Sequence, residues 1–103
     1  VLASWERAYA DAMIPVYEAF GGDPDIAALY IDSQIMLTPW QIYDVDERVP
    51  NPEAREKEIQ AALRRSLAGA GADHIGVLHF DIHVQEMSPA PEQALPSARR
   101  LQE

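Results

Sequence analysis

The 103-residue chain contains no cysteine, so it can form neither disulfides nor thiolate metal sites. Basic residues are few: eight Lys and Arg stand against 17 Asp and Glu, which gives a formal net charge of −9. Nucleic acids and anionic membranes bind basic surfaces, so this charge argues against both as partners. The sequence shows no apolar run near the roughly 18 residues that a membrane span needs. No secretory signal is visible at its start, and we expect a cytoplasmic protein.

Several sequence signals of catalysis and of β-structure are also missing. There is no G-x-S-x-G turn, and the glycines at 69 and 71 follow a helical pattern instead of opening a phosphate-binding loop after a strand. No alternating run of apolar and polar residues is bounded by hairpin turns, so the sequence requires no sheet. With 48% hydrophobic residues, the chain has enough apolar material for the core of one globular domain.

The patterns that are present predict about five helices. Asp23-Pro24 and Asn51-Pro52 are start signals, because Asp or Asn caps a helix and proline suits its first position. Asp73 is the expected cap of a further helix, and Thr38-Pro39 is a stop signal. The predicted helices cover residues 2–20, 24–37, 52–68, 74–87 and 91–101. Short turns between them predict an all-α fold of stacked antiparallel helical hairpins, with residues 1–103 as a single domain.

The spacing of apolar residues predicts which helix faces are buried. The first helix shows a stripe of Leu2, Trp5, Tyr9, Met13, Val16 and Phe20, and the second is expected to bury Ile26, Leu29, Tyr30, Ser33 and Leu37. In the third, Ile59, Leu63 and Leu67 form one stripe opposite a charged face. Residues 39–49 form a connector that Trp40, Ile42 and Tyr43 are expected to anchor to the core. Alternatively, Trp40 and Tyr43 could line a ligand groove together with Trp5.

The segment 74–87 carries the strongest candidate site. His79, His83 and Glu86 stand at positions i, i+4 and i+7, so their side chains leave one stripe of an otherwise apolar helix, which is predicted to be buried. Two imidazoles one turn apart can share a metal ion, and a carboxylate further on can join or orient them. This set suits a divalent ion such as zinc, iron or manganese. The alternative is that both histidines only form hydrogen bonds to neighbouring helices.

Three stretches resemble segments of a family of tetratricopeptide-like (TPR-like) proteins of bacteria and fungi. Residues 30–40 (YIDSQIMLTPW) are similar to its A-E-A-L-M-N-L-x-P-W segment. Residues 73–89 (DHIGVLHFDIHVQEMSP) are similar to D-H-P-G-x-x-H-x-Y-I-H-x-x-E-x-S-P. Residues 91–101 (PEQALPSARRL) continue the similarity to P-E-x-A-L-P-x-A-x-R-L. The family pattern goes on with H-x-x-H-M-P-x-H, beyond the last residue given, so the resemblance implies a fragment of a longer architecture.

The resemblance implies a TPR-like fold and adds weight to a polar, metal-binding site. This chain departs from the family pattern at several positions: Asp32 stands at the glutamate position, Met36 at the asparagine position, Ile75 at the proline position and Asp81 at the tyrosine position. The change at 36 weakens a polar role for the second helix. Asp81 adds a carboxylate to the histidine helix, but at i+2 from His79 it should point to a different side.

Two hypotheses of function follow. In the first, the chain is a metal-dependent binding or catalytic domain, with His79, His83 and Glu86 as ligands and with Asp32 and Glu86 as candidate catalytic carboxylates. In the second, it is a non-catalytic scaffold whose hairpins bind a peptide or a partner protein. No reaction follows from the residues, so the sequence leaves open whether the protein is an enzyme. Helical repeats need neighbours to cover their outer faces, which predicts that the chain either associates with itself or docks onto the rest of a longer chain.

Overall fold

The computed structural model describes residues 2–103 and is all-helical over that range. Its elements are α1 (Leu2–Phe20), α2 (Pro24–Ile35), α3 (Glu56–Leu67), α4 (Ile75–Met87), the 3₁₀ helix η1 (Pro91–Ala94) and α5 (Leu95–Gln102). Residues 2–103 contain no strand, and their only isolated β-bridge joins Tyr43 to Pro50 in the connector. None of the helices in this range is long and apolar enough to cross a membrane. The prediction of an all-α fold with about five helices is confirmed.

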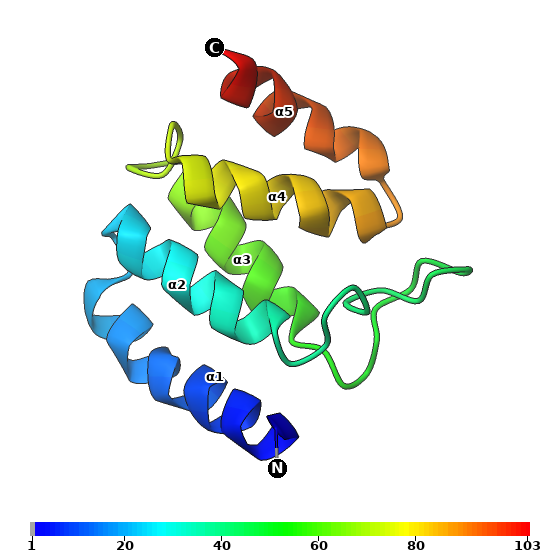
Figure 1. Ribbon diagram of the computed structural model, residues 1–103. Helices are drawn as coiled ribbons and strands as arrows, with labels where there is room; N and C mark the ends of the chain where they lie inside the picture. Colours follow the sequence, from blue (N-terminus) through cyan, green and yellow to red (C-terminus); the bar gives the residue numbers. More distant parts are fainter. Residues whose placement is uncertain (1) are drawn as a thin grey trace.

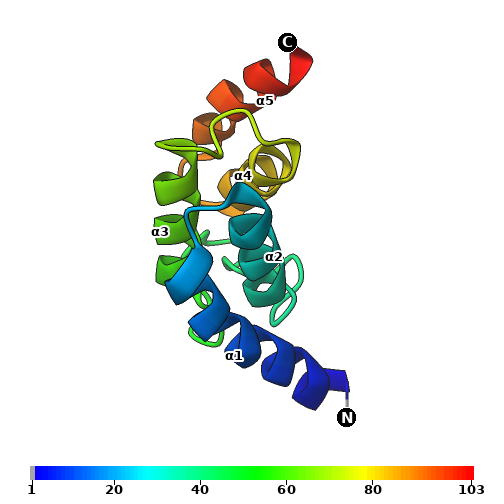
Figure 2. The ribbon, with the colours of Figure 1, turned by 90° about the vertical axis from the view of Figure 1, so that its left-hand side faces the viewer.

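The helices α2 and α4 are the central elements. The first packs against α1, α3 and α4, and the second packs against α2, α3 and α5. Figure 1 shows α1, α2, α4 and α5 following one another across the molecule, while Figure 2 shows α1, α3 and α5 forming an arc with α2 and α4 on its inner side. Each central helix therefore has neighbours around most of its circumference and keeps one face open on the inner side of the arc.

The core is built where α2, α3, α4 and the connector meet. Its largest fully buried apolar side chains are Ile31, Ile42, Ile59, Leu63, Val77 and Val84. The predicted stripe of α3 is confirmed, because Ile59 and Leu63 are buried and Leu67 packs against the cluster. Between α1 and α2, the rings of Tyr17 and Tyr30 stack with their centroids 4.1 Å apart. These contacts fix the two central helices to the rest of the fold.

Two helix starts differ from the prediction. The α3 helix begins at Glu56 instead of residue 52, because the Asn51 side chain accepts a hydrogen bond from the Glu53 amide at 2.9 Å and forms a local turn. The cap of α4 is His74 instead of Asp73: its Nδ1 accepts from the Val77 amide at 3.2 Å. The Asp73 carboxylate instead pairs with Arg100 of α5. The last predicted helix, 91–101, is η1 followed by α5.

The N-terminal ends of α2 and α4 lie side by side and run in the same direction. Nε2 of His74 is 2.7 Å from Oδ1 of Asp25, which joins the two starts. One turn on, a Cβ placed on Gly76 would be 3.5 Å from Cβ of Ala28 and 3.1 Å from the His74 ring. A side chain at position 76 would thus meet Ala28 at an ordinary van der Waals distance and would crowd chiefly the ring of His74, the cap of the same helix. The pairing brings the later turns of both helices, where the candidate residues lie, to the same side of the molecule.

The buried faces of α1 and α2 match the prediction only in part: Met13 packs against the core and Tyr30 and Ser33 are buried, as predicted, whereas other members of both stripes are exposed. In α1, Trp5 is 76% exposed and Phe20 is 65% exposed, because this helix packs against α2 alone and buries chiefly the side of Ala10. The side chain of Leu2 lies outside the described residues. In α2, three neighbouring helices enclose the face of Ala27, Tyr30, Ile31 and Gln34. Leu29 is consequently 50% exposed, on the open face that also carries Asp32 and Met36.

The connector is held at two points. Ile42 and Tyr43 are buried in the core, as predicted. Arg48 Nη1 donates to the backbone oxygens of Glu86 at 2.7 Å and Ser88 at 3.0 Å, where α4 ends. The last carbonyls of a helix lack partners within the helix and carry partial negative charge, so an arginine stabilises them. The connector is thereby fixed beside the end of α4 that carries the second candidate histidine.

Candidate functional site

The two histidines of α4 lie together, as their spacing predicted. The rings of His79 and His83 meet edge to face, with centroids 4.5 Å apart and planes at 80°. They are not inside a buried helix, however: His79 is exposed and His83 is half-buried. The buried face of α4 is formed by Val77, Leu78, Asp81, Val84 and Gln85. The prediction of an almost completely enclosed helix is wrong, because no helix within residues 2–103 covers the inner side of the arc at α4 (Figure 2).

A pocket of about 200 Å³ brings Asp32 to the histidines. It lies between the open faces of α2 and α4 and the turn at Pro39 and Trp40. Asp32, His79 and His83 line it, and the rest of its lining is apolar: Ile35, Met36, Pro39, Trp40, Phe80 and Met87. The structure therefore gathers three of the four residues that the sequence singled out, from helices more than 40 positions apart.

The Asp32 carboxylate is not neutralised by the protein. Among the described side chains it has neither a hydrogen-bond partner nor an ion-pair partner. Burial raises its pKa above the ordinary value for aspartate, because the charged form loses hydration. Tyr9, whose hydroxyl donates to the Leu29 carbonyl at 3.4 Å, has a pKa raised by burial and then by the negative charge of Asp32. An added cation would relieve the electrostatic cost of this group.

The Glu86 side chain lies apart from the pocket. Its Oε1 is 3.5 Å from Nδ1 of His83, and its side chain is 59% exposed. It does not line the pocket that holds Asp32. Within the part of the chain that the structure describes, no three His, Asp or Glu side chains are already grouped so that they could hold a metal ion. The predicted trio is thus divided: His79 and His83 line the pocket, whereas Glu86 lies outside it, next to Nδ1 of His83.

Trp40 takes the second of the two positions that the sequence left open for it, because it lines the pocket with the histidines. It was expected to anchor the connector in the core, yet it is 66% exposed and has a backbone φ of 61°. A tryptophan in this left-handed region is strained, and such strain concentrates at functional sites. Its ring meets the edge of His83 with centroids 5.2 Å apart. Pro39 and the connector thus place a strained, exposed aromatic ring beside the histidine pair.

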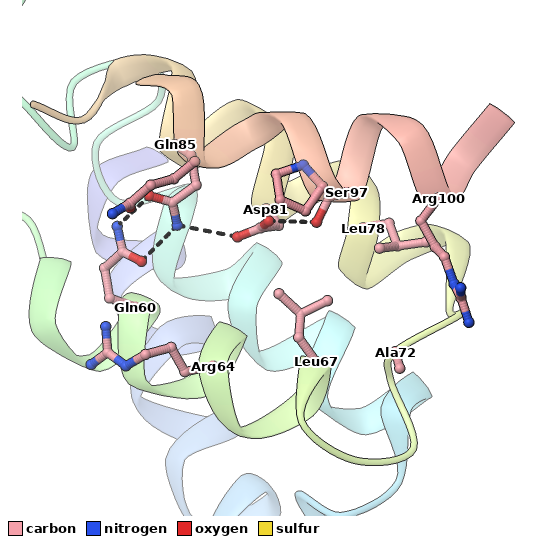
Figure 3. Close-up of a pocket in the computed structure, with 11 residues that line it drawn as sticks. Gln60, Arg64, Leu67, Ala72, Leu78, Asp81, Gln85, Ser97 and Arg100 are labelled. Carbon is pink, nitrogen blue, oxygen red and sulfur yellow. Dashed lines mark hydrogen bonds between the residues drawn. The ribbon is translucent and has the colours of Figure 1, made fainter. Parts of the chain in front are cut away.

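A second hollow, on the other side of α4, was not found from the sequence. It measures about 520 Å³ and lies between α3, α4 and α5 (Figure 3). The Asp81 carboxylate lines it and is 5% exposed, so the expectation that Asp81 and His79 point to different sides is confirmed. The sequence does contain a signal for this hollow. Residues 77, 78, 81, 84 and 85 have the spacing of one helix face, and all of them are apolar except Asp81 and Gln85. Polar residues on a core stripe mark a buried polar network.

Comparison of the chain with protein-family models, with curated proteins and with solved structures finds no match. The residues and their geometry are therefore the grounds for a proposal of function.

Proposed function

We propose that this chain is a TPR-like helical module that binds a divalent metal ion in the pocket between α2 and α4. His79 and His83 are the nitrogen ligands, and Asp32 is the carboxylate that faces them. One observation carries the proposal: these three side chains line a single pocket although they come from two helices far apart in the sequence. The cytoplasm is the compartment in which we place this module.

The chemistry of the pocket suits zinc, iron or manganese. Neutral imidazoles and carboxylates are ligands that these ions accept, and two histidines with one carboxylate leave positions open for water or another ligand. Zinc needs ring nitrogens at about 2.0–2.1 Å and carboxylate oxygens at about 2.0–2.2 Å. His79 is exposed and His83 half-buried, so both rings have room to turn toward Asp32. The ion would also neutralise the unpaired carboxylate.

Glu86 takes an orienting role in this proposal. Its carboxylate lies next to Nδ1 of His83 and outside the pocket. A carboxylate that holds one ring nitrogen leaves the other nitrogen for the metal and fixes the direction of the ring. Asp32, which lies inside the pocket, is the better placed of the two predicted catalytic carboxylates to act on a bound ligand.

The test is the metal content of the purified and reconstituted protein, measured by elemental mass spectrometry. We expect about one equivalent of zinc, iron or manganese per chain. Either His79→Ala or His83→Ala should abolish it while leaving the helical circular dichroism signal nearly unchanged, because both side chains are at least partly exposed. His74→Asn is the matched control: it removes an imidazole outside the pocket but keeps a side chain that can cap α4. Unchanged stoichiometry in His83→Ala would refute the proposal.

A second candidate function is a scaffold that binds a peptide on the same face. It is favoured by the exposed apolar side chains along this face, with Leu29 at 50%, Met36 at 40% and Trp40 at 66% exposure. Selection of displayed peptides against the metal-free protein tests it. A scaffold would enrich peptides whose binding depends on Trp40 and not on His83, so the variants Trp40→Ala and His83→Ala separate the two functions.

A further inference from the structure

The hollow between α3 and α5 is a second candidate site, chemically unlike the first. Figure 3 shows the Asp81 carboxylate between Gln85 and Ser97, above Leu67, with Arg64 and Arg100 at opposite ends of the hollow. Its polar lining comes from α3, α4 and α5, and Leu67, Leu78 and Pro96 supply apolar walls. About 520 Å³ is enough space for a small organic molecule.

A hydrogen-bond network fixes the position of Asp81. Its Oδ2 accepts from the Ser97 hydroxyl at 2.6 Å, and its Oδ1 accepts from the Gln85 amide at 3.1 Å. The side chains of Gln60 and Gln85 exchange two further hydrogen bonds, at 2.7 and 3.1 Å. Because neighbours from α3, α4 and α5 hold it, the carboxylate is preorganised and does not have to be ordered by a ligand.

The network satisfies hydrogen bonds but supplies no opposite charge. Both donors to Asp81 are neutral, and within the described residues no Lys, Arg or His side chain forms an ion pair with it. At 5% exposure the carboxylate has lost nearly all contact with water, and a buried charge without a counter-charge is unfavourable. An ionised carboxylate has about four lone-pair sites, of which these two hydrogen bonds use half. The remaining acceptor capacity suits a cationic donor.

The two arginines differ in what they offer. Arg100 is already paired with Asp73, and its Nη1 lies 3.6 Å from Oε2 of Glu103. Arg64 forms no ion pair with the described side chains and is exposed at the α3 end of the hollow. The hollow therefore presents a buried negative group, an apolar wall and one free guanidinium at its edge.

From this arrangement we infer that the hollow binds a small amino-acid-like molecule. Its ammonium group contacts Asp81, its apolar stem lies on Leu67, and its carboxylate faces Arg64. The site is on the opposite side of α4 from the metal pocket, since Leu78, Asp81 and Gln85 point away from His79 and His83. It is independent of the proposed metal function, and either can fail without the other.

Three compounds of equal stem length test the inference by isothermal titration calorimetry on the whole chain. They are 5-aminopentanoate with both charges, pentylamine with the cation alone, and pentanoate with the anion alone. We expect 5-aminopentanoate to bind most tightly, pentylamine more weakly and pentanoate not at all. The inference is overturned if neither amine shows saturable binding at concentrations up to about tens of millimolar. It is also overturned if pentanoate binds as tightly as pentylamine.

Variants assign the binding to the named groups. Asp81→Asn should weaken both amines at least about tenfold, whereas Asp46→Asn, which removes the same charge from the exposed connector, should change neither. Arg64→Gln should lower the affinity of 5-aminopentanoate to that of pentylamine. If Asp81→Asn disturbs folding, Ala72→Phe narrows the hollow without touching the hydrogen-bond network and should also abolish binding. If Asp46→Asn weakened amine binding as much as Asp81→Asn, the amines would be bound by the overall negative charge of the protein, and the proposed site would be refuted.

Discussion

At the scale of single residues, the molecule places unfavourable features where ligands could compensate them. Asp32 carries a half-buried charge that has no partner among the described side chains, and Trp40 holds a strained backbone conformation with most of its side chain exposed. Neither feature is required by the core, which is complete without them. Both lie on the pocket that also contains His79 and His83. Two locally unfavourable features, a charge without an ion-pair partner among the described side chains and a strained backbone, thus occur in the same pocket, as expected of a functional surface.

The strain at Trp40 predicts an unusual preference for glycine. At a φ of 61°, the Cβ of alanine is sterically unfavourable, because this is the left-handed region, whereas glycine has no Cβ and is not destabilised. We expect Trp40→Gly to be more stable than Trp40→Ala by about 1 kcal/mol in urea denaturation. Both variants lack the indole, so the comparison isolates the backbone. The same pair at Gln41, where φ is not positive, should show no such advantage for glycine. If Trp40→Ala were as stable as Trp40→Gly, the backbone at position 40 would not be strained.

Tyr43 predicts a loss of stability at alkaline pH. Burial, together with the hydrogen bond that its hydroxyl donates to Glu56 at 2.5 Å, raises the pKa of Tyr43 to about 12 from 10.0. Above pH 10 the unfolded chain has released this proton while the folded chain still holds it, so stability falls as pH rises toward 12. We expect the free energy of unfolding to drop by about 2 kcal/mol more in the wild type than in Tyr43→Phe between pH 10 and 12. If the free energy of unfolding fell equally with pH in the two proteins, the Tyr43 phenol would not contribute to the pH dependence of stability.

At the scale of helices, position in the packing decides which face is buried. The helix α3 has one charged and one apolar face, so its burial follows its pattern. The patterns of α2 and α4 are apolar on several sides, and neighbours on three sides select among them. This selection exposes Leu29 and Ile75 and buries Gln34, Asp81 and Gln85. The open faces of the two helices then form the lining of one pocket.

The turn between α3 and α4 depends on the absence of a side chain at Gly71. A Cβ there would lie 2.0 Å from Oγ and 2.8 Å from the carbonyl oxygen of Ser66, whereas a Cβ on Gly69 would meet nothing closer than 3.6 Å. Since the Gly71 amide also donates to the Ser66 carbonyl at 2.8 Å, the backbone cannot easily move away. We expect Gly71→Ala to lower the free energy of unfolding by about 1–3 kcal/mol.

The matched control for this turn is Gly69→Ala, which should change stability by less than about 0.5 kcal/mol. Thermal unfolding of the two variants side by side is the measurement. Equal effects of the two substitutions would contradict the close approach of Gly71 to Ser66.

At the scale of the whole molecule, the chain is thin. It measures 40 × 36 × 18 Å, so it is about two helices thick in its shortest dimension. A layer this thin cannot enclose all of its large apolar side chains, and Trp5 at 76%, Phe20 at 65% and Ile75 at 73% remain exposed. Single exposed apolar residues are common on protein surfaces, but thin layers of helical hairpins are typical of architectures whose outer faces are covered by neighbouring segments.

We therefore expect the isolated chain to self-associate. Analytical ultracentrifugation should give a mass above 11.5 kDa that falls on dilution. Trp5→Gln should shift the equilibrium toward the monomer, because it removes the most exposed large aromatic side chain of α1. A single species of 11.5 kDa at high protein concentration would contradict this expectation.

The sequence by itself determined the helical class, most helix boundaries and the candidate residues on α4. Caps, stop signals and helical spacing act between near neighbours, so Asp23, Pro24 and the pair His79 and His83 could be interpreted without a structure. The core residues of α3 and the anchoring by Ile42 and Tyr43 follow from the same local patterns. The resemblance to TPR-like proteins remains a proposal.

Only the tertiary structure decided which faces stay open and which distant residues meet. Asp32 shares a pocket with the histidines because α2 and α4 pack side by side, and this packing joins residues more than 40 positions apart in the sequence. Glu86 is separated from Asp32, and Trp40 is exposed, because of where the connector and the end of α4 lie. Asp81 is buried because α5 covers it. Local propensity contains no information on these relations, since burial depends on all neighbours of a helix at once.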